Sequence, residues 1–294
     1  FKKFKEDEFD IIVIDEAHRI GASSYQKIIQ YFKPKLLLGM TASPERTDGY
    51  DVYKEFNYNI ACEIRLKQAL EENFLCPFHY FGITDIEFDG ETIDENTELS
   101  DFSKLTCDER VNYIIKQIEF YGHSGTTTNG LIFCSSKREA LALSDKFNDR
   151  GYFTVVLTGE DSQEKRKEAI NRLTSKNIEE KIDYIFTVDI FNEGVDIPEI
   201  NQVIMLRPTK SPIVFVQQLG RGLRKAEDKE YVVILDFIGN YKNNFMIPIA
   251  LSGDRSYNKD NIRRYVLEGE RIIPGSSTIH FDEISKKRIF EAID

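Results

Sequence analysis

The sequence contains little cysteine and histidine, and neither residue type is arranged as a metal site requires. Its four cysteines, Cys62, Cys76, Cys107 and Cys134, form no C-x-x-C pair, and no histidine lies at ligand spacing from any of them. Because structural zinc sites use cysteine and histidine ligands at short spacings, we expect no zinc site. Each cysteine is instead expected to be a small buried or half-buried apolar side chain in a reducing compartment.

The chain also lacks any long apolar run and any signal-peptide pattern. A membrane-spanning helix needs about 20 consecutive apolar residues, so we expect no membrane segment. Without an export signal, the predicted location is the cytoplasm.

A net positive charge is missing as well, since the formal net charge is −11. Proteins that bind nucleic acids usually carry a basic surface, so this value argues against such a partner. The charge is unevenly spread, however. Nine acidic residues and one lysine lie between positions 67 and 100, and the remainder of the chain is close to neutral. Local basic patches that contact phosphate are therefore compatible with the sequence.

The last absence is a phosphate-binding loop. An α/β domain that binds phosphate usually has a Gly-rich loop after its first strand, and the pattern G-x-x-x-x-G-K-[ST] occurs nowhere in the chain. The first residues nevertheless have an α/β pattern. Apolar runs at 9–14 and 36–40 predict two buried parallel strands. A helix capped by Ser23 or Ser24 lies between them and ends before Pro34, so these elements form part of a βαβ sheet.

A second α/β unit is predicted further along the chain. Its helices include one through Val111 and Ile118, one that begins at Ser136, and one capped by Asp161 or Ser162. Short strands that alternate with helices indicate a parallel, doubly wound sheet. The expected strands are 131–134, 153–157, 182–187, 203–206 and 231–237.

Between the two units, residues 78–83 alternate like a strand, and the acidic segment 85–101 has no periodicity. We interpret this segment as an exposed connector without chemistry. The last residues, from 239, have weak periodicity and are expected to be helical in part. The predicted division is an α/β region at 1–66, a connector at 67–105, a second α/β domain at 106–240 and a C-terminal extension at 241–294.

Two adjacent acids, Asp15 and Glu16, follow the first predicted strand. They stand at its carboxyl end, where open α/β sheets place their sites. In P-loop NTPases an aspartate in this position holds Mg²⁺, and the metal neutralises charge on the phosphates. A neighbouring glutamate can accept a proton from the attacking water. The alternative is an acidic strand end without a ligand.

Two arginines, Arg221 and Arg224, are spaced three apart and so share nearly one helical face. Gln217 precedes them. Arginine forks stabilise the charge on a transferring phosphoryl group and contribute about 10³–10⁵ in rate. The alternative is a surface helix with two salt-bridged arginines. Gly220 and Gly222 argue against it, because glycine weakens a helix that has no need of a close backbone approach.

A third stretch, residues 187–198, follows a predicted strand and contains Gly194 in a turn and Asp196 before Pro198. Its backbone amides and the Thr187 hydroxyl can bind phosphates, and Asp196 can reach a sugar hydroxyl. The alternative is an ordinary turn after a strand.

Together these stretches resemble the ordered motifs of the superfamily 2 helicases and translocases, from motif II onward. The sequences of residues 193–198, 220–225 and 235–240 resemble those of the bacterial group related to type I and type III restriction-enzyme motor subunits. The matching stretches are 15–18 for the DEAH form of motif II, 41–43 for motif III, 131–134 for motif IV, Thr158-Gly159 with Arg166 for the next contact stretch, 187–198 for motif V and 217–224 for the QxxGRxxR of motif VI. The fold implied is two RecA-like parallel-sheet domains, the first one incomplete, plus a short C-terminal extension.

The resemblance implies a nucleotide site with ATP and Mg²⁺ as cofactors. Asp15 would bind the metal through water, Glu16 would be the general base, and His18 would bridge to motif VI near Gln217. Arg221 and Arg224 would contact the γ-phosphate. Gly194 and Asp196 would belong to the same site, with Asp196 near the ribose.

The resemblance also implies coupling and nucleic-acid contacts. Thr41 and Ser43 would couple the nucleotide state to domain position. The residues that would hold the nucleic-acid backbone are Thr158, Gly159, Arg166 and Thr187. Such contacts involve phosphate and sugar, so binding should be largely independent of sequence and sensitive to salt.

The family's motif I, with its phosphate-binding lysine, should precede Phe1. The resemblance therefore implies that the chain is a fragment of a longer protein, and that the fragment alone hydrolyses ATP poorly or not at all.

The sequence thus favours an ATP-dependent helicase or translocase, with DNA favoured over RNA as its partner. One alternative is a double-strand DNA translocase subunit that serves a nuclease in a restriction or defence system. A second is a nucleic-acid-binding module that no longer hydrolyses ATP, and a third is an α/β scaffold without activity.

Overall fold

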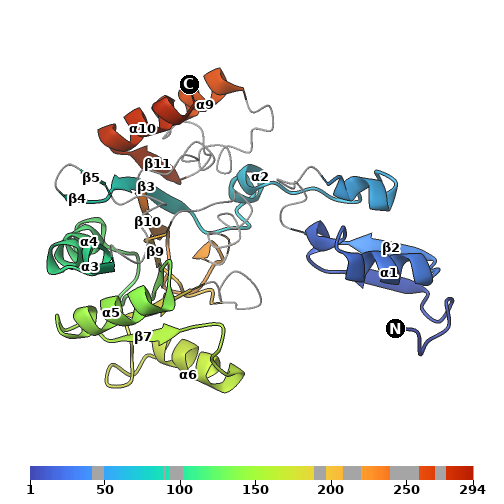
Figure 1. Cartoon of the computed structure of the whole chain (residues 1–294), viewed down its shortest axis with the longest axis horizontal. Helices are drawn as coiled ribbons and strands as arrows, with labels where there is room; N and C mark the ends of the chain where they lie inside the picture. The colour runs from blue at the N-terminus through green and yellow to red at the C-terminus, as the bar shows by residue number, and fades with distance from the viewer. Residues whose placement is uncertain are drawn as a thin grey trace. The chain divides into compact units, whose positions relative to one another are not determined.

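The computed structural model describes residues 1–41, 50–88, 91–92, 102–188, 197–207, 220, 222–238, 258–268 and 276–293. They form two compact units, Phe1–Ile64 and Arg65–Asp294. Figure 1 shows the elements of both units. No helix in these ranges is long and apolar enough to cross a membrane.

The first unit is a small βαβ arrangement. Strands β1 and β2 pair in parallel, with Ile11 opposite Leu36 and Ile14 opposite Gly39, as the two apolar runs predict. The other elements are the short 3-10 helices η1 and η2 and the helix α1, which ends before Pro34. The bounds are β1 Ile11–Ile14, η1 Ala17–Arg19, α1 Ser23–Tyr31, β2 Leu36–Gly39 and η2 Val52–Phe56.

The prediction that both strands are buried is wrong for one face of this sheet. Ile12 and Leu37 pack into a cluster with α1 and η2, whereas Ile11, Val13 and Leu36 are 60%, 52% and 51% exposed. Successive side chains of a strand point to opposite faces. Only the face toward α1 is therefore covered within the described part of this unit.

The second unit is built on a seven-stranded sheet with the order β11-β3-β10-β9-β6-β8-β7. Every neighbouring pair is parallel, and Figure 1 shows β11 and β7 at opposite ends of the sheet. The strands are β3 Phe78–Thr84, β6 Gly130–Phe133, β7 Thr154–Leu157, β8 Tyr184–Thr187, β9 Gln202–Met205, β10 Val232–Ile238 and β11 Thr278–Phe281, and a separate short hairpin pairs β4 Glu87–Phe88 with β5 Glu91–Thr92.

Helices cover both faces of this sheet, because the strands are apolar on both sides. One face packs against α4 and α5, and the other against α6, α9 and α10. This confirms the predicted α/β class with a parallel, doubly wound sheet. The helices are α2 Leu66–Glu71, α3 Phe102–Leu105, α4 Asp108–Tyr121, α5 Lys137–Asn148, α6 Gln163–Leu173, α9 Lys259–Glu268 and α10 Glu283–Ile293.

Two helix starts follow from capping side chains. Ser136 Oγ accepts the Glu139 amide at 3.1 Å, and Ser162 Oγ accepts the Lys165 amide at 3.2 Å. Each serine satisfies an amide that has no partner inside its helix. Both helices therefore begin where the sequence places their caps.

Two strands extend the sheet beyond the predicted second domain. β3 lies in the segment 67–105 that the sequence marks as a connector, and it pairs with β10 on one side and β11 on the other. β11 comes from the C-terminal segment, which the sequence predicts to be helical in part. Parallel partners lie far apart in the chain, so the alternation at 78–83 predicts a strand but not its place in the sheet.

One fully buried cation joins the helices α4 and α5 to the residue that follows β3. Arg110 of α4 is 0% exposed, and its Nε and Nη2 donate to Asp85 Oδ2 at 2.9 and 2.7 Å. Its Nη1 lies 3.3 Å from Glu139 Oε1 of α5, and Glu139 Oε2 accepts the Ser135 amide at 2.8 Å. Burial raises the pKa of Glu139, against the attraction of Arg110.

We predict that Arg110→Leu lowers the free energy of unfolding by about 3–5 kcal/mol, because it leaves buried carboxylates without their cation. Urea denaturation measures this loss. The control is Lys137→Met, which removes an exposed ion pair with Glu160 and should change the midpoint little. Equal midpoints for both variants would contradict the prediction.

A second buried charge makes stability depend on pH. Asp236 of β10 is 2% exposed and accepts a hydrogen bond from the Tyr80 hydroxyl of β3 at 2.7 Å. Burial raises the pKa of Asp236 to about 7, while the Tyr80 hydrogen bond acts in the opposite direction. Between the ordinary pKa of 3.8 and about 7, the folded chain keeps this proton and the unfolded chain loses it. Folding stability therefore falls as pH rises through this window.

Asp236→Asn should remove this dependence, since the amide is neutral and can still accept from Tyr80. Its free energy of unfolding should exceed that of the wild type by an amount that grows from pH 5 to pH 8, on the order of a few kcal/mol. Denaturation at both pH values measures the difference. A difference that stays constant with pH is the contrary result.

Candidate functional site

The turn after β1 places Asp15 and Glu16 at the carboxyl end of the first unit's sheet. Glu16 has φ 51° and ψ 47°, in the left-handed region, and its amide donates to Asp15 Oδ1 at 2.9 Å. The next amide, that of Ala17, donates to the Met40 carbonyl at 2.8 Å. A left-handed conformation costs a residue with a side chain about 1–2 kcal/mol. Such strain is typical of functional positions.

His18 and Thr41 lie beside these acids. His18 Nδ1 is 3.1 Å from Thr41 Oγ1 and 3.3 Å from Glu16 Oε2. The contact with Glu16 lacks hydrogen-bond geometry, and Glu16 Oε2 is buried without a hydrogen-bond partner in the described part of the chain. The ends of β1 and β2 thus bring together Asp15, Glu16, His18 and Thr41. Ser43 lies outside the described residues.

This arrangement suits a magnesium ion that is shared with a phosphate ligand. In the described ranges, no group of three or more His, Cys, Asp or Glu side chains could hold a metal by itself. Mg²⁺ typically uses one or two carboxylates together with water and substrate phosphates. Asp15 is exposed, and one of its oxygens remains available beside the one that accepts the Glu16 amide.

In the second unit, two threonines lie at the ends of neighbouring strands. Leu157 of β7 pairs with Thr187 of β8, and Thr158 follows Leu157 directly. The amide and hydroxyl of Thr158 donate to Asp161 Oδ2 at 2.6 and 3.1 Å. Thr187 is 0% exposed, and its hydroxyl has no partner in the described residues.

Arg166 of α6 reaches the same edge of the sheet. Its Nη2 donates to the Gly159 carbonyl at 3.0 Å, and its buried Nε has no partner among the described residues. Thr158, Gly159 and Arg166 therefore form one local group. Asp161, which the sequence suggests only as a helix cap, is the residue that fixes Thr158, and Lys165 Nζ in turn contacts Asp161 Oδ1 at 2.6 Å. A lysine four residues after an acid is the signal that could have indicated this pair.

Arg224 is exposed and follows Leu223, which is fully buried. The other predicted residues of this half of the site, Gly194, Asp196, Gln217 and Arg221, lie outside the described residues. The bridge from His18 to Gln217 therefore stays a prediction.

Two family models match the chain. Residues 109–226 match "Helicase conserved C-terminal domain", and residues 1–46 match "Type III restriction enzyme, res subunit". The matches confirm the resemblance: the chain is related to the superfamily 2 helicases, and to the restriction-enzyme motor subunits among their relatives.

Particular relatives agree with this assignment. IRC3 of Saccharomyces cerevisiae, whose name assigns it provisionally to the ATP-dependent helicases, is 28% identical over 86% of this chain and 37% of its own length. The type I restriction enzyme EcoAI endonuclease subunit of Escherichia coli is 28% identical over 81% of this chain and 32% of its own length. The chain thus spans about a third of these relatives.

A solved structure supports the fold. The ATP-dependent type ISP restriction-modification enzyme LlaBIII bound to DNA aligns with 97% of this chain and 23% of its own, with a TM-score of 0.63 and 18% identity. This confirms a RecA-like α/β fold.

Because the Thr187 hydroxyl has no partner among the described residues, we predict that its removal has opposite effects on stability and on binding. Thr187→Val removes a buried polar atom without a partner, so we expect the free energy of unfolding to rise by about 1–3 kcal/mol. Affinity for nucleic acid should fall. Chemical denaturation and a fluorescence binding titration measure the two effects.

The matched control is Thr154→Val on the adjacent strand β7. The Thr154 hydroxyl bonds with Ser144 and Asn148, so this variant should lose stability and keep its affinity. A Thr187→Val variant that loses both stability and affinity would count against a ligand-binding role for this hydroxyl.

Proposed function

We propose that the protein is an ATP-dependent motor that moves along or unwinds nucleic acid. The proposal rests on where the buried polar side-chain atoms without a hydrogen-bond partner lie. Among the described residues, the buried side-chain atoms without a hydrogen-bond partner belong to Glu16, Arg166 and Thr187. All three residues lie in stretches that resemble helicase motifs. Because burying a polar group without a partner is costly, these atoms are expected to meet a ligand or water.

ATP would bind with Mg²⁺ held through water by Asp15. Glu16 would accept a proton from the attacking water, and His18, which lies 3.1 Å from Thr41 Oγ1, would bridge to the motif that contains Gln217. Arg221 and Arg224 would stabilise the charge that develops on the γ-phosphate. Gly194 and Asp196 would contact the nucleotide, and Gln217 would connect His18 to the arginines.

Nucleic acid would lie at the carboxyl edge of the second unit's sheet. Thr158, Gly159, Arg166 and Thr187 offer donors suited to phosphate and sugar, so binding would be largely independent of sequence and would weaken with salt. Ser43 would join Thr41 in coupling the two sites. Hydrolysis would then change the relative position of the units and so move the strand.

We predict that Glu16→Gln lowers nucleic-acid-stimulated ATP hydrolysis by about 10²–10⁴-fold, because the amide cannot act as a general base. Affinity for ATP should be retained. The assay uses the protein as the cell produces it, with single- and double-stranded DNA and RNA as stimulants. Residues 1–294 alone, which have no G-x-x-x-x-G-K-[ST] loop, should hydrolyse ATP poorly.

The control is Glu8→Gln, an exposed acid outside the motifs, which should leave the rate unchanged. The motor proposal fails if no nucleic acid stimulates hydrolysis by the wild-type protein, and a non-hydrolysing nucleic-acid-binding module would then be favoured. It also fails if Glu16→Gln hydrolyses ATP at the wild-type rate.

A second candidate is a double-strand DNA translocase that serves a nuclease in a restriction or defence system. The match of residues 1–46 to the restriction-enzyme subunit model and the EcoAI relative favour it. Displacement of a third strand from duplex DNA, without separation of the duplex, distinguishes this translocase from a helicase.

A further inference from the structure

The backbone just before Arg224, at Gly222 and Leu223, is held by hydrogen bonds from two other segments. Leu223 is fully buried, and its carbonyl accepts the Cys76 amide, which precedes β3, at 2.7 Å. The Gly222 backbone packs onto the sheet: a Cβ built there would lie 3.4 Å from both Val203 of β9 and Val232 of β10.

The side chain of Lys229 holds this backbone from the other segment. Its Nζ donates to the Gly222 carbonyl at 3.0 Å, to the Ile200 carbonyl at 3.1 Å and to the Pro198 carbonyl. These carbonyls belong to two segments: the end of the turn that carries Arg224, and the segment that leads into β9. A lysine ammonium has three donors and no acceptor, so three carbonyls satisfy it fully.

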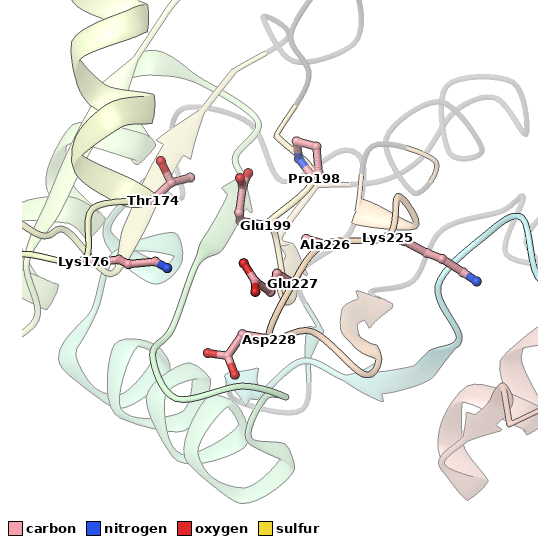
Figure 2. A pocket seen from close by; sticks show the side chains of 8 residues that line it. All are labelled: Thr174, Lys176, Pro198, Glu199, Lys225, Ala226, Glu227 and Asp228. Atoms are coloured by element: carbon pink, nitrogen blue, oxygen red, sulfur yellow. The ribbon is translucent and has the colours of Figure 1, made fainter.

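The two segments lie close together on the surface of the second unit. Figure 2 shows Pro198 and Glu199 beside Lys225, Ala226 and Asp228, and these residues line one pocket. Burial lowers the pKa of Lys229 to about 8, with Cys76 and Glu199 acting to raise it. The ammonium therefore keeps its charge and all three donors at neutral pH.

We propose that Lys229 is a positioning residue for Arg224, because it fixes the Gly222 carbonyl to the segment before β9. The backbone of Arg224, two residues after the anchored carbonyl, is then held in a fixed position. The inference rests on the proposed function, in which Arg224 acts on the γ-phosphate. A group that acts mainly in the transition state affects kcat more than KM.

The test compares Lys229→Met with Lys181→Met in nucleic-acid-stimulated ATP hydrolysis by the protein as the cell produces it. Lys181 is a matched control: its Nζ donates to the Leu173 carbonyl at 2.6 Å and to Asn129 Oδ1 at 2.7 Å. It caps α6 in the same unit and donates no hydrogen bond to Gly222, Ile200 or Pro198, although its partner Asn129 bonds with the Glu199 carbonyl. Both variants should lower Tm by similar amounts. Only Lys229→Met should lower kcat, by about tenfold with little change in KM, as expected from a displaced catalytic group.

A double-mutant cycle shows whether Lys229 acts through Arg224. In an Arg224→Ala background, Lys229→Met should lower kcat no further, since the group that it positions is gone. Lys229→Gln keeps neutral donors and should have an intermediate kcat, which provides a second variant if Lys229→Met does not fold.

The positioning role is overturned if the wild type is active and Lys229→Met keeps its kcat, or if Lys181→Met loses kcat equally. It is also overturned if the effects of Lys229→Met and Arg224→Ala add. An inactive wild type would overturn the proposed function itself, which none of these three results does.

Discussion

Parallel pairing is the constraint on which the candidate site depends. Every neighbouring pair in the seven-stranded sheet is parallel, so the segments after β6, β7 and β8 emerge at one edge. Thr158 and Thr187 are neighbours there for this reason, although 28 positions separate them in the chain. The smaller sheet of the first unit repeats the arrangement, with Glu16 and Thr41 just beyond the ends of β1 and β2.

Among the described residues, the buried side-chain polar atoms without a hydrogen-bond partner belong to a few groups, Glu16, Arg166 and Thr187. Arg110 meets two carboxylates and a carbonyl, and Lys229 meets three carbonyls. In contrast, Glu16 Oε2 is buried without a hydrogen-bond partner in the described part of the chain. A protein with marginal stability keeps such features only where they serve something else. This contrast distinguishes the positions expected to bind a ligand from those that maintain the fold.

Local patterns in the sequence predict most elements, and they fail where the answer depends on distant partners. Apolar runs and capping serines locate β6, β8, α5 and α6, because strand burial and helix starts are local properties. The pairing of β3 with β10 and β11 joins segments more than 150 residues apart, which no local pattern encodes. Motif order likewise predicts which residues approach a ligand. It does not predict the roles of Asp161 and Lys229, because neither residue belongs to a motif. Asp161 bonds with Thr158 and Lys165, and Lys229 donates to backbone carbonyls.

The proposed function requires that the acids of the first unit and the arginines of the second complete one ATP site. The most direct test is the distance between spin labels on Lys27→Cys of α1 and Lys167→Cys of α6, both exposed positions, with the exposed Cys62 replaced by serine. Pulsed electron resonance measures this distance with and without nucleic acid and a non-hydrolysable ATP analogue. The account predicts one shorter, narrower distance distribution when both ligands are present. The same distribution with and without the ligands would contradict it.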